Sequence, residues 1–531
     1  MADHAPPRPL VGPRAASATR PPRAGLPRWA SAAALPVVLG ALALALRLVR
    51  HDVAYGVFID EVTYADIARS VAAGDGVRLH GEPFTLHPPL AFLVTGAVVR
   101  LAGLADQADL LPVVLALRPV AAVFGALVVV LTTLTVRAAG AQRAALVAGS
   151  LLALDPFGLQ FDGRLMLEST AQAFTVLTVL ACVLAARGAP GAGRGWVVLA
   201  AVAGSATFAT KETFGLVVLG ALALLLLLGV GLPRRRTGAV LAGTLVGYAA
   251  VNALVVATVG AGTWWASRTS GLARLLGTEQ TTGFNAPDSQ VSLWSRVAAN
   301  ALQYGASYCV LGLGGLTGLV LLALTRRRVA GGGRLLGAGA PRGRAVLAAW
   351  AVAACCYLAY AVGFGSLEEQ MFYIPLAPCA VLCALLVDAA LASPRGRQRS
   401  AAAVLVAATL LLQGGQYVRV RTEPDDAYLH LLSWIGREVP GGSVLAMTEE
   451  TGEFLVRDQR VGQWGTLAEL RSHHVDYVVI STALVAQGYG FAEPGFVAAL
   501  HGVGVRSAVF TGRTDTALEV WDVRAYTGGS R

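Results

Sequence analysis

Charged residues are scarce in this sequence. Only 14% of its 531 residues are Asp, Glu, Lys or Arg, whereas soluble globular proteins contain about 25%. Hydrophobic residues make up 55% of the chain, and they gather in runs of about twenty positions, the length that a helix needs to cross a bilayer. The scarcity of charge therefore excludes an ordinary water-soluble enzyme, and the apolar runs indicate a polytopic membrane protein.

Several sequence signatures are missing. The six cysteines lie in or at the ends of apolar runs, without the spacing of metal ligands or of a disulfide framework. The chain has no glycine-rich nucleotide loop, no internal repeat and no convincing set of oxygen ligands for a divalent metal. We therefore expect no metal or other cofactor. The 42 basic residues outnumber the 32 acidic ones, but the arginines cluster between apolar runs, where they set topology, so we expect no nucleic-acid partner.

The placement of arginine orients eleven predicted membrane spans. These cover residues 29–49, 117–136, 144–161, 169–186, 196–210, 214–232, 239–259, 305–324, 345–364, 371–392 and 401–417. With eleven spans, the short arginine-rich connections all fall on the cytoplasmic side, as the positive-inside rule requires. The apolar segment 89–104 contains Arg100, and counting it as a span would move most of those arginines outside. We therefore expect it to lie at the membrane interface.

The chain divides into three predicted parts. Residues 1–28 are a basic tail rich in Pro and Ala, expected to be disordered and cytoplasmic. Residues 29–417 form a transmembrane domain with a large first external loop at 50–116. Residues 418–531 form a small extracytoplasmic α/β domain with helices at 425–439 and 467–474 and strands at 443–447, 477–480, 505–510 and 517–523. The predicted fold class is thus mainly α.

The first external loop carries two motifs that bear on chemistry. Asp60 and Glu61 begin an amphipathic helix, with Tyr64 at helical spacing. The carboxylates either complement the helix dipole or supply a general base that takes a proton from a hydroxyl. His87 precedes Pro88 and Pro89. That motif is either a simple joint into the interfacial segment or a device that holds an imidazole beside phosphate oxygens.

Two cations lie at the outer ends of predicted spans. Arg164 and Glu168 are spaced i,i+4, which predicts either a local ion pair or an arginine free to clamp a phosphate. Lys211, followed by Glu212, is the single lysine beside 41 arginines. Its retention is either chance or a sign that the site needs a compact ammonium group, and a phosphate contact suits it.

Aromatic and acidic residues follow in later external segments. Trp264 and Trp265 are typical of an aromatic belt at the membrane surface, with stacking on a sugar as the alternative. Glu369 either caps a helix or binds an acceptor.

Together these motifs resemble the polyprenol-phosphate-dependent glycosyltransferases of family 39, which include the protein O-mannosyltransferases and the bacterial lipid A aminoarabinose transferase and share the GT-C fold. The resemblance covers about residues 29–417. It implies that Asp60 is the catalytic base and that Glu61 assists it. It also implies that the donor phosphate is bound by His87, Arg164 and Lys211. Further candidates for substrate binding are Tyr64, Glu168, Glu212, Trp264, Trp265 and Glu369. Glu168 stands where such proteins often have Asp.

The expected function is an inverting transfer of a mannose- or arabinose-type sugar from a polyprenyl-phosphate donor to a hydroxyl of an envelope glycan, lipid or protein. The arginine- and alanine-rich composition indicates a bacterium with a GC-rich genome, and so a plasma-membrane enzyme with its active face outside. One alternative is a transporter or flippase, which predicts ionisable residues in mid-span and repeat symmetry. Another is a non-enzymatic cell-envelope scaffold whose external domain binds a partner.

Overall fold

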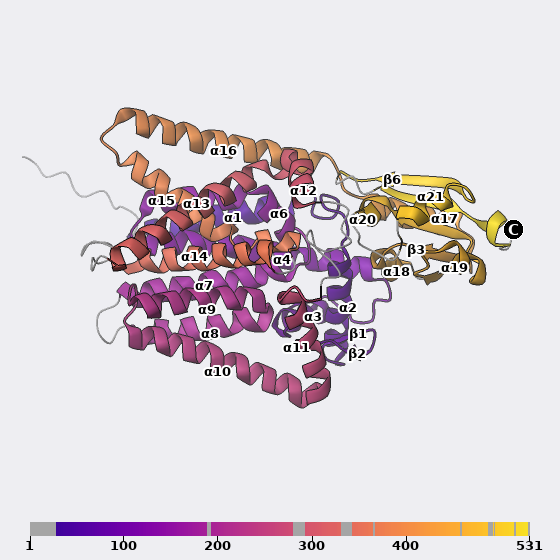
Figure 1. Cartoon of the computed structure of the whole chain (residues 1–531), viewed down its shortest axis with the longest axis horizontal. Coiled ribbons are helices and arrows are strands. Elements are labelled where there is room, and N and C mark those ends of the chain that lie inside the picture. Colours follow the sequence, from indigo (N-terminus) through magenta and orange to yellow (C-terminus); the bar gives the residue numbers. More distant parts are fainter. Residues whose placement is uncertain are drawn as a thin grey trace, which may run out of the picture.

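The computed structural model describes residues 28–187, 193–279, 292–330, 342–364, 367–456, 459–486, 492, 494–513 and 517–528. Long helices form an elongated bundle, and a small α/β domain lies at one end of it (Figure 1). Helices α2 and α3 lie at that same end. Residues 1–27 of the predicted tail lie outside the described residues.

The bundle is built from helices that follow the apolar runs of the sequence. They are α1 (Arg28–Leu48), α4 (Leu110–Ala138), α5 (Gln142–Leu154), α6 (Pro156–Asp162), α7 (Leu167–Arg187), α8 (Arg194–Thr210), α9 (Glu212–Leu228), α10 (Arg234–Val259), α13 (Ala301–Ala330), α14 (Arg342–Gly363), α15 (Leu376–Leu391) and α16 (Gly396–Thr422). The predicted span 144–161 is split, because Asp155 and Pro156 separate α5 from α6 with a bend of 61°.

Each of the eleven predicted spans coincides with helix in the described structure. Six of the described helical segments are long and apolar enough to cross a membrane, or seven if the bent pair α5–α6 is one span. The number eleven therefore stays a prediction, although the polytopic membrane class is confirmed. Helix α3 (Leu90–Leu101) has 12 residues, roughly 18 Å, which is too short for a hydrocarbon core of about 30 Å.

The predicted first external loop, residues 50–116, folds against the bundle. It contains α2 (Ile59–Ala73), the antiparallel pair β1 (Arg78–Leu79) and β2 (Glu82–Pro83), and α3. Further structure at this end comes from α11 (Ala261–Leu275), α12 (Leu293–Ala299) and the 3₁₀ helix η1 (Glu369–Phe372). No residue of α11 is buried, as expected for a helix that lies on a surface.

The C-terminal domain is a five-stranded mixed sheet with short helices. Its strands are β3 (Val444–Met447), β4 (Arg460–Gly462), β5 (Tyr477–Ser481), β6 (Val505–Thr511) and β7 (Ala517–Asp522), in the order β4-β3-β5-β7-β6. Strand β3 pairs in parallel with β4 and β5, and β7 pairs antiparallel with β5 and β6. The helices are α17 (Ala427–Glu438), α18 (Glu450–Leu455), α19 (Leu467–Ser472), α20 (Thr482–Ala486), α21 (Pro494–Leu500) and α22 (Arg524–Thr527). The four predicted strands are present.

One hydrophobic core joins this domain to the first external loop. Val62 and Phe92 of the loop pack in the same cluster of buried residues as Leu431 and Leu445 of the domain. Across this junction the rings of His80 and Phe454 stack at a centroid distance of 4.7 Å. The C-terminal domain is therefore packed directly on the segment that carries Asp60.

Candidate active site

Asp60 lies in the first turn of α2, where the helix begins after an extended residue. Phe58 has φ −117° and ψ 148°, and its backbone N–H donates to the Glu61 Oε2 at 3.2 Å. A carboxylate in the first turn is favoured by the helix dipole. Asp60 and Glu61 are thus both held in the first turn of α2, but their side chains contact different neighbours.

Glu61 is enclosed in a buried ion pair. Its Oε1 and Oε2 accept hydrogen bonds from Nε and Nη2 of Arg118 on α4, each at 2.9 Å, and both side chains have no exposed area. Oε1 also accepts from the backbone N–H of Leu165 at 2.8 Å. Glu61 therefore ties α2 to α4 and to the turn after α6, with both oxygens engaged by protein donors.

Asp60 instead lies near charged side chains from other segments. Burial raises the pKa of its carboxyl to about 7, from an ordinary value of 3.8. The Lys211 ammonium opposes this shift of the pKa, and the carboxylates of Glu168 and Glu368 add to it. The Tyr64 hydroxyl, one turn further along α2, hydrogen-bonds to Asp60. The structure thus places Asp60, Tyr64, Glu168 and Lys211 together, as a base near neutrality needs.

Lys211 occupies the break between α8 and α9. Its backbone is extended at φ −155° and ψ 119°, so the chain steps out of helix at this residue. The Nζ donates to Oε1 of Glu168 and, at 3.2 Å, to Oε1 of Gln370. Both members of the Lys211–Glu168 pair are buried. An ammonium has three N–H donors, so one remains for a substrate.

His87 is held by aromatic rings next to this group. Its ring lies edge-on to those of Tyr64 and Phe84, with centroid distances of 6.1 Å in both cases. Burial lowers the pKa of His87 well below 6.5, and the nearby charges of Lys211 and Arg274 lower the pKa further. A neutral imidazole keeps one N–H donor, which suits a contact with a phosphate oxygen.

Two arginines of α11 complete the cations around His87, and neither was among the predicted site residues. Arg274 pairs with Glu368, with Nη2 to Oε1 at 3.0 Å. Arg268 pairs with Glu212 of α9. The sequence signal was the presence of both arginines in an external segment rich in Trp. Their position against Glu212 and Glu368 depends on how α11 folds back onto the bundle.

Arg164 is not part of this group. Its guanidinium carbon lies 5.9 Å from the ring centroid of Tyr55 and 5.7 Å from that of Phe58. Within the described parts of the chain it forms no ion pair, and the i,i+4 pair with Glu168 is not formed, since Glu168 bonds to Lys211. The three residues expected to bind the donor phosphate are therefore divided between two places.

The remaining predicted substrate contacts are distributed around the same end. Glu212 accepts from the Tyr248 hydroxyl at 2.5 Å as well as pairing with Arg268. The Trp264 indole donates to Asn252 at 3.0 Å, so its N–H is used within the protein. Trp265 is 63% exposed, and Glu369 begins η1 in a partly exposed position.

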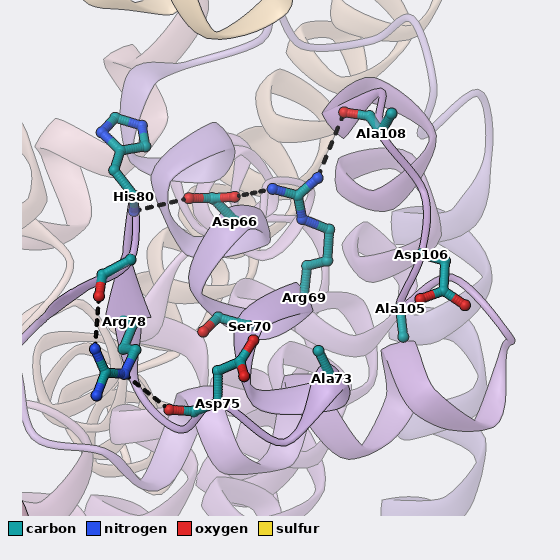
Figure 2. Close-up of a pocket in the computed structure, with 11 residues that line it drawn as sticks. Asp66, Arg69, Ser70, Ala73, Asp75, Arg78, His80, Ala105, Asp106 and Ala108 are labelled. Atoms are coloured by element: carbon teal, nitrogen blue, oxygen red, sulfur yellow. Dashed lines mark hydrogen bonds and ion pairs between the residues drawn. The ribbon is translucent and has the colours of Figure 1, made fainter.

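A polar hollow of about 750 Å³ lies on another side of α2 (Figure 2). Arg69, which lines it, comes nine residues after Asp60, and nine residues turn a helix by about 180° relative to the start. Figure 2 shows Asp66 between the backbone N–H of His80 and the guanidinium of Arg69, at 3.3 and 2.6 Å. The hollow therefore lies on the face of α2 opposite to Asp60.

The described residues contain no group of three or more His, Cys, Asp or Glu side chains placed to hold a metal ion. The expectation that no metal is bound thus remains a prediction.

Part of the chain is similar to a known family. Residues 37–261 match the family model of dolichyl-phosphate-mannose-protein mannosyltransferases. The matched segment, which is less than half of the chain, is similar to that family. The matched segment contains Asp60, His87 and Lys211. Arg268, Arg274 and Glu368 of the candidate site lie outside it.

Solved structures show that the chain has the GT-C fold. The crystal structure of ArnT from Cupriavidus metallidurans bound to undecaprenyl phosphate has a TM-score of 0.56 and 15% sequence identity to this chain, and the match covers 95% of this chain and 99% of that one. The archaeal oligosaccharyltransferase AglB from Archaeoglobus fulgidus, in complex with an inhibitory peptide and a dolichol-phosphate, has a TM-score of 0.55 and 14% identity, covering 93% and 74%. A comparison with curated proteins gave no match. The chain is thus a polytopic membrane protein with the GT-C fold.

Proposed function

We propose that the protein transfers a sugar from a polyprenyl-phosphate donor to a hydroxyl group of an envelope acceptor, with Asp60 as the general base. The observation that carries the proposal is the position of one carboxyl, with a pKa of about 7, beside a group of cations. A base whose pKa is near the working pH is ionised often enough to act and basic enough to accept the proton.

The cations near Asp60 suit a phosphate leaving group. Lys211 has a free N–H, and Nε of Arg268 is buried without an acceptor in the described structure. Fixed donors at a site where negative charge develops are the largest source of stabilisation in many enzymes. The ArnT and AglB structures, which hold undecaprenyl phosphate and dolichol-phosphate, support a lipid phosphate as the ligand here.

The reaction would be a direct displacement. The acceptor oxygen bonds to the anomeric carbon while the bond from that carbon to the phosphate oxygen breaks. The acceptor proton passes to Asp60, and the bonding electrons leave with the polyprenyl phosphate. One base suffices, and the configuration of the sugar inverts. Glu61, whose oxygens are both engaged by Arg118, acts in this scheme as a positioning residue that fixes the start of α2.

The test is a donor panel in membranes that contain the protein and in matched membranes that lack it. Polyprenyl-phosphate mannose and polyprenyl-phosphate arabinose are each supplied with a label in the sugar, and both sugar transfer and polyprenyl-phosphate release are measured. Transfer matched by release for one donor supports the proposal and names the sugar. Movement of intact donor across the membrane without release would instead support a flippase, and neither transfer nor movement would favour the scaffold.

A further inference from the structure

Three arginines from distant segments surround the ring of Tyr55. Arg164 comes from the turn after α6, Arg421 from the last turn of α16, and Arg513 from the turn between β6 and β7. Their guanidinium carbons lie 5.9, 5.2 and 5.8 Å from the centroid of the ring. The sheet domain after α16 therefore contributes Arg513 to this arginine cluster, and the helical bundle contributes Arg164 and Arg421.

Five of the nine guanidinium nitrogens in the arginine cluster are buried without an acceptor in the described structure. Arg421 donates through Nη2 to the carbonyl of Leu46 at 3.0 Å, and Arg513 donates through Nη2 to the carbonyl of Ala54 at 2.9 Å. The five buried nitrogens that have no acceptor among the described residues are Nε of all three arginines and Nη1 of Arg421 and Arg513. The side chain of Arg513 is only 2% exposed.

Such an arrangement is unfavourable without an anion. A buried donor that lacks an acceptor costs about 1–3 kcal/mol, and contact with an aromatic face offsets only part of that cost. Three guanidinium groups also repel one another. In the described structure the carboxylate that pairs with the cluster is that of Asp425, whose Oδ2 lies 3.9 Å from Nη2 of Arg513. One carboxylate at that distance does not balance three cations.

The arginine cluster is separate from the cations next to His87. The charges that act on His87 are those of Lys211, Arg274 and Arg268. Those that act on Tyr55 are Arg421, Arg513, Arg164 and Arg47. Phe58 connects the cluster to the candidate base, since its ring contacts Arg164 and it precedes Asp60 by two residues.

Two separate cation groups near the candidate base match the two reactants of a displacement. The leaving phosphate and the attacking hydroxyl lie on opposite faces of the anomeric carbon, so separate sets of cations suit groups carried by the two reactants. We propose that the arginine cluster binds an oxyanion, a phosphate or a carboxylate, carried by the acceptor. The assignment of this anion to the acceptor rests on the proposed glycosyl transfer, whereas anion binding itself does not.

The experiment measures the binding of inorganic phosphate by calorimetry to the full chain in phosphatidylcholine nanodiscs. All proteins carry Lys211→Gln, which weakens the other candidate phosphate site. On this background we compare Arg421→Gln and Arg513→Gln with Arg419→Gln, a control on the same helix whose side chain is 44% exposed and pairs with Glu423. Because charge-assisted hydrogen bonds are lost, each cluster variant should bind phosphate about tenfold more weakly, with the control unchanged.

Folding and the source of the anion are controlled separately. Thermal melting checks each variant, and Arg513→Lys, which keeps the charge, should bind phosphate more tightly than Arg513→Gln. Equal affinity in all variants, or an equal loss in Arg419→Gln, would overturn the site. A second set of nanodiscs contains phosphatidylglycerol. An unchanged affinity for phosphate in the phosphatidylglycerol nanodiscs supports the assignment of the anion to the acceptor. A strong loss of phosphate affinity there would show that the lipid headgroup occupies the arginine cluster, and would overturn that assignment. No step requires glycosyl transfer, so an inactive donor panel leaves this test intact.

Discussion

The buried pair of Glu61 and Arg118 gives a prediction that separates a positioning role from a catalytic one. Glu61→Gln removes the charge and leaves the shape almost unchanged. The amide oxygen still accepts one hydrogen bond, but the amide nitrogen then faces a guanidinium N–H that was 2.9 Å from a carboxylate oxygen. Breaking a fully buried ion pair from one side costs about 3–5 kcal/mol, and the retained hydrogen bond places this case near about 3 kcal/mol.

This free energy converts into a measurable change in Tm. An unfolding entropy of about 2.1 cal/mol/K per residue gives about 1.1 kcal/mol/K for the 531 residues of the chain. If the chain unfolds as one unit, Glu61→Gln lowers Tm by about 3 °C. Arg118 keeps its hydrogen bonds to four backbone carbonyls in this variant, but its positive charge is no longer paired with a carboxylate. The four carbonyls are those of His51, Asp52, Tyr55 and Gly56.

The assay is thermal melting of the purified protein in one detergent, with Arg118→Gln and the double variant measured in parallel. We expect the double variant to lose less than the sum of the two single losses, because each single variant already breaks the same pair. A Glu61→Gln protein with wild-type Tm and abolished transfer would refute the reasoning, since it would show that Glu61 acts on the substrate rather than on α2.

Three further predictions concern catalysis. Because Asp60 must be ionised to accept a proton and its pKa is about 7, kcat/KM should rise about tenfold per pH unit below pH 7 and level off above it; a flat profile from pH 5 to 8 would contradict this. Lys211→Gln should lower kcat about 100-fold or more, and the kcat of Lys211→Arg should lie between those of Lys211→Gln and the wild type. A change in KM alone would contradict a role of Lys211 in the transition state. Arg274→Gln should raise the KM for the donor about tenfold, with Arg100→Gln, at an exposed arginine of α3, as the matched control; equal effects of both would show only a loss of surface charge.

Periodic features of the sequence predicted much of the fold. Apolar runs predicted helix at all eleven predicted spans, and shorter runs after residue 418 predicted the strands β3, β5, β6 and β7. The short strand β4 was missed because its three residues are too few to show a period. The bend at Asp155 was also missed. There the helix is interrupted after α5, and the Asp155 side chain caps the start of α6 by accepting a hydrogen bond from the N–H of Gly158 at 2.8 Å.

Long-range pairings in the site were beyond sequence reasoning. The adjacent residues Asp60 and Glu61 looked equivalent, and only the contact with Arg118, 57 residues away, distinguishes their roles. Arg118 lay within a predicted span and carried no motif. The separation of Arg164 from Lys211 likewise depends on packing, because Glu168 has two possible cationic partners in sequence and selects Lys211.

The most direct test of the central claim compares Asp60→Asn with Asp52→Asn, an exposed aspartate of the same loop. Both proteins are brought to equal abundance in membranes, and transfer of labelled sugar is measured with the donor that the wild type uses. A general base contributes about 100- to 10,000-fold to the rate, so Asp60→Asn should lose at least about 100-fold in transfer while Asp52→Asn retains wild-type activity. Transfer by Asp60→Asn at the wild-type rate would contradict the assignment of Asp60 as the base.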